Sequence, residues 1–130
     1  MPTIAKQLHR PLMIVATIAL SFSLLVYILY AINLIQFPFD YDQGEGFEVY
    51  DAVLFSQGEL PYRDTEAYPF YASNYPPLFH VIMAPFVWFF GAGYWYGRLL
   101  SFLSTFITAG AIAYAVYHDG HKHRWLALLS

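Results

Sequence analysis

The feature that most constrains this chain is an uncharged apolar run from Leu12 to Ile35, about two dozen residues long. At about 1.5 Å per residue, a helix of this length crosses the roughly 30 Å hydrocarbon core of a bilayer. A cleaved signal peptide is the competing interpretation. However, the run is longer than the apolar region of a signal peptide, and no small-x-small cleavage motif follows it. The sequence therefore predicts an uncleaved transmembrane helix over residues 12–35.

The composition agrees with a membrane protein, because 58% of the residues are hydrophobic, 21% are aromatic and only 12% are charged. Eight of the nine acidic residues fall between positions 40 and 66, where Arg63 is the only base. Nucleic acid is therefore excluded as a partner, since it requires a basic surface. The absence of cysteine excludes disulfides, thiol nucleophiles and thiolate metal sites.

Two further spans are predicted, over residues 76–92 and 97–117, and a fourth begins near residue 125. The first is short and contains Pro85, so we expect a thin or tilted crossing. The second is rich in small residues, which suits close packing of helices. Because the last apolar run stops at residue 130, we expect residues 1–130 to be the N-terminal part of a longer polytopic chain. Membrane lipid and the remainder of that chain are then its partners.

Charges flanking the first span predict the orientation. Lys6 and Arg10 precede it and the acids follow it, which puts the N-terminus in the cytoplasm and residues 36–75 in an outer loop at the plasma (inner) membrane. Strict alternation then places the turn at 91–98 inside and the loop at 118–124 outside. The bases of the 118–124 loop favour the inside instead, and a re-entrant segment at 78–90 would satisfy that preference.

The outer loop is predicted to carry a short amphipathic helix. Phe47, Tyr50 and Leu54 recur at helical spacing, while Glu45 and Glu48 project elsewhere. Such a helix next to a membrane exit should lie along the lipid surface. Gly58 is the expected stop. The predicted fold class is therefore an all-α membrane protein with several spans and one surface helix in its outer loop.

The acidic motif Asp40-x-Asp42-x-x-Glu45 has two interpretations. Asp42 can be the N-cap of the surface helix, with Glu45 completing a capping-box-like exchange. Alternatively, one carboxylate is a general base for an acceptor hydroxyl, or Asp40 and Asp42 bind a divalent cation. Both can hold at once, because a capped helix end is a rigid mount for a functional carboxylate.

The remaining candidates are bases and histidines. Arg98, at the start of a span, is either an interfacial anchor or a phosphate contact. His80 lies alone in an apolar segment, and we expect it to be hydrogen-bonded inside the helix bundle. The loop at 118–124 contains three histidines that could hold a metal, although so short and charged a loop is more typical of a solvated connector: His118, His121 and His123.

Three short motifs follow the acidic one in a fixed order: GELPYRD at 58–64, NYPPLF at 74–79 and GAGYWYGRLLS at 91–101. This order, from about residue 12 to the end, resembles the start of the polytopic C-type glycosyltransferases related to protein O-mannosyltransferases. The resemblance implies transfer of a sugar from a polyprenyl-phosphate donor to an acceptor hydroxyl at the outer face, with the catalytic acid in the first outer loop. It also favours strict alternation of the spans.

In that family the acidic motif is often Asp-Glu. Here it falls on Asp42-Gln43, so that the second acid is displaced to Glu45. We therefore expect Asp42 and Glu45 to be catalytic, and Asp40 and Arg98 to bind substrate. Residues 1–130 lack a convincing phosphate clamp, so this part alone should be inactive. The alternative is a small non-catalytic membrane subunit or assembly factor.

Overall fold

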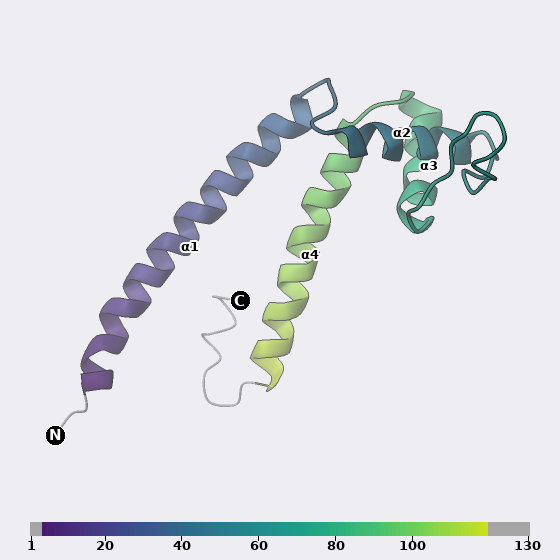
Figure 1. The fold of residues 1–130 in the computed structure, drawn as a ribbon. Helices are drawn as coiled ribbons and strands as arrows, with labels where there is room; N and C mark the ends of the chain where they lie inside the picture. Colours follow the sequence, from purple (N-terminus) through teal and green to yellow (C-terminus); the bar gives the residue numbers. More distant parts are fainter. Residues whose placement is uncertain (1–3, 120–130) are drawn as a thin grey trace. The chain divides into compact units, whose positions relative to one another are not determined.

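A computed structural model describes residues 4–119, which form four helices and no strand. Figure 1 labels them as α1 (Ile4–Gln36), α2 (Gln43–Ser56), α3 (Leu78–Phe90) and α4 (Trp95–Asp119). The all-α prediction is confirmed for this part of the chain, and the expected start of a span near residue 125 lies outside it. The chain divides into two compact units, which we call the central unit (residues 34–100) and the two-helix unit (the rest of α1 and α4).

The two-helix unit contains most of the two apolar helices that are long enough to cross a membrane. The qualifying stretches are His9–Gln36, with 28 residues, and Trp95–His118, with 24 residues. In this unit the hydroxyl of Tyr27 donates a hydrogen bond to Oγ1 of Thr105 over 3.1 Å, and the Tyr27 ring stacks on Phe102. Most other large apolar side chains of the unit are exposed. By length and composition both helices suit a bilayer.

Helix α2 ends where the sequence predicts. Gly58 has a φ of 77°, a conformation that favours glycine. Its N–H donates to the carbonyl of Phe55, and the N–H of Glu59 donates to the carbonyl of Leu54. This pair of bonds is a Schellman motif, the usual hydrogen-bond pattern at a helix end closed by glycine. The predicted stop at Gly58 is confirmed.

Helices α2 and α3 pack against each other through a small apolar core of Ala52, Met83 and Tyr96. Within the central unit, α2 buries only part of its predicted apolar face. Leu54 is buried, but Phe47 and Tyr50 stay 51% and 42% exposed. In their place α2 turns Asp51 and Ala52 inward, because α3 brings a polar group, described below, to this side of the helix.

Helix α3 is shorter than the span predicted at 76–92. Its 13 residues extend about 20 Å, well short of a hydrocarbon core of roughly 30 Å. His80 and Met83 are buried against the rest of the central unit. On other sides of the helix, Trp88 and Phe89 are 74% and 80% exposed. The helix therefore offers apolar side chains both to its own unit and to its surroundings.

The turn between α3 and α4 is tied to the first turn of α4. The hydroxyl of Tyr96 donates to the carbonyl of Gly91 and accepts from the N–H of Gly93. The Tyr96 ring stacks on Phe86, with ring centroids 5.7 Å apart. At Gly97 an added Cβ would lie 2.8 Å from Cε of Met83. Glycine at this position therefore permits the close approach of α3 to the start of α4.

Candidate functional site

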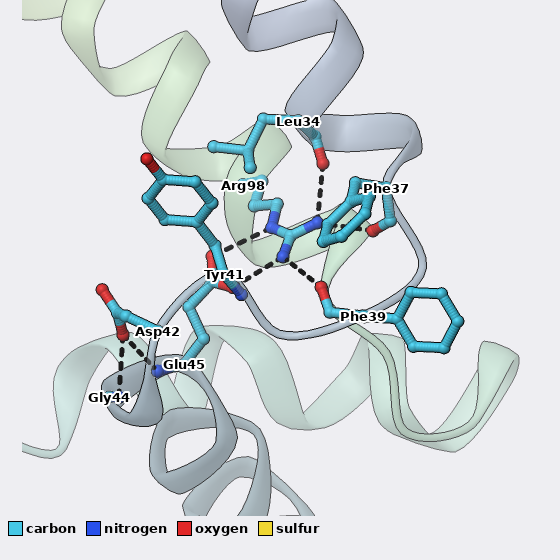
Figure 2. A network of polar contacts seen from close by, with 8 residues as sticks. All are labelled: Leu34, Phe37, Phe39, Tyr41, Asp42, Gly44, Glu45 and Arg98. Carbon is cyan, nitrogen blue, oxygen red and sulfur yellow. Dashed lines mark hydrogen bonds and ion pairs between the residues drawn. The ribbon is translucent and has the colours of Figure 1, made fainter.

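The start of α2 is capped by Asp42, as the sequence predicts. Its Oδ1 accepts hydrogen bonds from the N–H groups of Gly44 (2.8 Å) and Glu45 (3.1 Å), as Figure 2 shows. The return bond of the capping box is displaced by one residue. Oε2 of Glu45 accepts from the N–H of Tyr41 over 2.8 Å instead of that of Asp42. The exposed Asp42 carboxylate is thereby held in a fixed orientation.

Arg98 is the centre of the polar network in Figure 2. Its guanidinium binds Glu45 in a bidentate manner, with Nε 2.9 Å from Oε1 and Nη2 2.6 Å from Oε2. Nη1 donates to the carbonyls of Leu34 and Phe37, each at a distance of 2.6 Å. Nη2 also donates to the carbonyl of Phe39 at a distance of 2.8 Å. The residue is only 8% exposed. One side chain thus joins the end of α1, the following segment and the first turn of α2.

This arrangement uses all five N–H donors of the guanidinium. Arg98 therefore has no donor left for a substrate phosphate in the structure, and its geometry is that of an anchor. The carbonyl of Leu34, in the last turn of α1, accepts from the N–H of Phe37 and also from Arg98. The prediction that Arg98 contacts phosphate remains a prediction.

The bond between Arg98 and Leu34 also bears on topology. Strict alternation through a third span at 76–92 would place the end of α1 and the start of α4 at opposite faces of a membrane. The two groups lie 2.6 Å apart, so they lie at the same face of any membrane that α1 and α4 cross. This contact favours an arrangement in which α3 does not cross the membrane, and strict alternation through three spans stays a prediction.

The environment of Glu45 makes it a weak base. Its hydrogen bonds from Arg98, the largest cause, and from the N–H of Tyr41 hold the pKa of its carboxyl below the ordinary value. A carboxylate whose negative charge is stabilised in this way has a low affinity for a proton. Glu45 is therefore better suited to orient Arg98 and the helix end than to accept a proton from a substrate.

Asp40 is exposed and lies between Phe39, whose carbonyl binds Arg98, and Tyr41, whose N–H binds Glu45. Among residues 9–118 no three His, Asp or Glu side chains are placed to hold a metal ion. A divalent cation at Asp40 and Asp42 would therefore need most of its ligands from water or substrate. Of the three histidines near residue 120, His118 lies in α4 and the other two lie outside the described part of the chain.

The prediction that His80 is hydrogen-bonded among the helices is confirmed. Its partners, which the sequence did not predict, form with it a second polar cluster that we call the His80 cluster. It comprises Glu48, Asp51, Tyr71 and His80. Nε2 of the fully buried His80 is 2.5 Å from Oε2 of Glu48 and 3.7 Å from Oδ2 of Asp51. The hydroxyl of Tyr71 donates to Oδ1 of Asp51 over 2.7 Å. Glu48 thus points to α3 and not away from the packed face.

The His80 cluster links α2 to α3 and to the loop after residue 58. The contact between Nε2 of His80 and Oε2 of Glu48 joins α3 to α2. Burial and the hydrogen bond to Asp51 raise the pKa of Tyr71, which keeps its hydroxyl protonated as a donor. The sequence signal was the spacing of Glu48 and Asp51, three residues apart and so on one side of α2. Their partner lies 32 residues away from Glu48.

A shallow, open groove of about 400 Å³ is lined by Gln43, the residue that follows Asp42, and by residues near it in space. In it the rings of Phe47 and Tyr71 stack with their centroids 5.8 Å apart, and Tyr50 meets Tyr71 edge-on at 5.1 Å. The groove is lined by six residues: Gln43, Gly46, Phe47, Tyr50, Pro69 and Tyr71.

The chain matches no protein-family model, no curated protein and no solved structure.

The Arg98 network predicts a large loss of stability on a conservative substitution. Arg98→Lys keeps the charge but cannot reproduce the bidentate contact and the three carbonyl bonds. We expect the central unit to lose about 1–3 kcal/mol, the usual cost of leaving buried acceptors without a hydrogen bond. Denaturant unfolding in lipid nanodiscs measures this loss.

Arg63→Lys is the matched control, because Arg63 forms an exposed ion pair with Glu59. Exposed pairs contribute about 1 kcal/mol or less. Equal stability losses in the two variants would contradict the central position of Arg98.

The lowered pKa of Glu45 predicts an acid-dependent loss of stability. A carboxyl whose pKa is lower in the folded than in the unfolded state stabilises the fold fully above its unfolded value, here 4.5. That contribution disappears as the pH falls through the lowered value. We therefore expect the stability of the native chain to fall more steeply below about pH 4.5 than that of Glu45→Gln. Unfolding curves recorded at stepwise lower pH test this, and parallel curves for the two proteins would rule it out.

Proposed function

We propose that this chain is the N-terminal part of a membrane glycosyltransferase that moves a sugar from a polyprenyl-phosphate donor to an acceptor hydroxyl at the outer face. The observation that carries the proposal is the fixed position of the Asp42 side chain. This carboxylate stands at the position of the acid in the family that the sequence resembles. It is exposed, fixed by the cap of α2, and connected through Glu45 and Arg98 to the ends of both candidate spans.

Asp42 acts as the general base of the proposed reaction. Its Oδ1 accepts the two cap bonds, so Oδ2 takes the proton of the acceptor hydroxyl as that oxygen attacks the anomeric carbon. The bond between the sugar and the phosphate breaks, and its electron pair leaves with the lipid phosphate. Because the leaving phosphate already delocalises its charge, activation of the acceptor is the more demanding task.

Glu45 takes a positioning role in this scheme, because Arg98 keeps it ionised. Asp40 is close to Asp42 in the chain and remains the proposed second contact to substrate or to a substrate-bound cation. Arg98 holds the segment that carries both aspartates, so its effect on transfer is indirect. The donor phosphate is bound by the remainder of the polytopic chain.

The proposed membrane arrangement has two spans, α1 and α4, with the N-terminus in the cytoplasm and residues 37–94 at the outer face of the inner membrane. The bond between Arg98 and Leu34 supports entry of both helices from the same side. Helix α3 then stays at the outer face, where its exposed apolar side chains meet lipid. Residues 118–124 fall on the cytoplasmic side, as their bases favour.

Cysteine labelling tests this arrangement without background, because the chain has no cysteine. Cysteines at Gln57 and Thr65 should react with an impermeant maleimide in intact cells. Cysteines at Gln7 and Gly120 should react only after permeabilisation. Labelling of Gly120 from outside would restore strict alternation, and reversed labelling of all four would invert the proposed orientation.

Substitution of Asp42 tests the catalytic role in the complete enzyme. Asp42→Asn removes the charge but keeps the cap, since Asn caps a helix about as well as Asp. We expect transfer from a polyprenyl-phosphate sugar to fall by roughly 10²-fold or more, the usual effect of losing a general base. Expression and membrane insertion should stay unchanged.

Asp40→Asn is the control for charge in the same segment, and its effect should be smaller. Near-normal turnover of Asp42→Asn would remove Asp42 from the reaction and leave it a structural cap.

A further inference from the structure

We propose that the aromatic groove beside Asp42 binds a neutral sugar ring of the acceptor substrate. The identity of this ligand rests on the proposed function, but the evidence for a binding site comes from the groove itself. Its residues are those given above, on the first turns of α2 and on the loop at 69–71.

The first observation is that no neighbouring atom requires the glycine at position 46. Gly46 lies inside α2, where glycine destabilises a helix by about 0.5–1 kcal/mol relative to alanine. Nothing lies within 4 Å of the position that its Cβ would take. Gly97 differs, because a Cβ there would meet Met83. Since Gly46 lines the groove, a side chain at this position would occupy the groove, and glycine keeps it open.

The second observation is the exposure of the aromatic rings. Phe47 and Tyr50 remain about half exposed although they flank a packed helix face. Tyr71 is fixed against them because its hydroxyl is bound to Asp51. Flat apolar ring surfaces suit the C–H face of a sugar, and the Gln43 amide can both donate to and accept from its hydroxyls.

The third observation is the charge of the side chains in and around the groove. No cationic side chain lines the groove. Two carboxylates lie next to it, since Asp42 directly precedes Gln43 and Asp51 binds the Tyr71 hydroxyl. This environment repels the phosphate of a donor and accepts a neutral, hydroxyl-rich molecule. The groove therefore suits the acceptor, whose hydroxyl must approach Asp42.

Binding of methyl glycosides tests the proposal. Residues 1–130 are placed in lipid nanodiscs, because sugar-headed detergents would compete, and neutral methyl glycosides of hexoses and pentoses are added without any donor. Saturation-transfer NMR should detect binding with a Kd of about 1–10 mM, as expected for a small ligand in a shallow site. A hexose 1-phosphate should bind at least about fivefold more weakly.

Gly46→Leu is the decisive variant. Its Cβ meets no atom within 4 Å, its side chain occupies the groove, and leucine has the higher helix propensity, so binding should disappear while the protein stays folded. Gly110→Leu is the matched control, because Gly110 is also a helical glycine with open space around it but lies in the two-helix unit. It should bind as the native chain does.

Three results would overturn the proposal: no glycoside binds, Gly46→Leu binds as well as Gly110→Leu, or the sugar phosphate binds more tightly than the neutral sugars. These results are separate from the failure of the proposed function. Sugar binding that Gly46→Leu removes, together with normal turnover of Asp42→Asn in the complete enzyme, would keep the groove and discard the catalytic scheme. Loss of turnover in Asp42→Asn without any sugar binding would do the reverse.

Discussion

The guanidinium of Arg98 is the interaction on which the rest of the central unit depends. Without it the carbonyls of Leu34, Phe37 and Phe39 would lose their shared donor. Glu45 would lose its partner at the first turn of α2. The consequence extends to Asp42, because the N–H of Glu45 donates to the cap oxygen. Arg98, on α4, therefore helps to fix the position of Asp42. The connection consists of two hydrogen-bonded steps, from Arg98 to Glu45 and from Glu45 to Asp42.

The packing of α2 on α3 combines a small apolar core with a buried polar cluster. Ala52 and Met83 provide close contact, while Glu48 and His80 provide a directional bond. A buried ionisable group contributes little net stability, but it is costly to leave without its partner. The bond between Glu48 and His80 joins one position of α2 to one position of α3. The cluster also holds Tyr71 at the rim of the groove, so that buried polar groups shape an exposed surface.

Local patterns predicted the local structure of this chain well. The uncharged run at 12–35 identified α1, the Asp42 spacing identified the cap, and Gly58 identified the end of α2. Each signal lies within a few residues of the structure that it predicts. The segment predicted to span at 76–92 forms a shorter helix. Hydropathy shows that a helix has apolar side chains, but not whether those side chains pack against lipid or against a neighbouring helix. The Arg98 and His80 contacts could not be read from the sequence, since their partners lie 53 and 32 residues away.

The distance along the chain between Glu45 and Arg98 also sets an order of events during synthesis. A ribosome adds roughly 5–20 residues per second, so the carboxylate emerges about 3–10 seconds before the guanidinium that binds it. During this interval the first turn of α2 and the end of α1 have no cross-link. The segment between them can close only when residue 98, at the start of α4, has been synthesised. Completion of the central unit thus waits for the last few of its own residues.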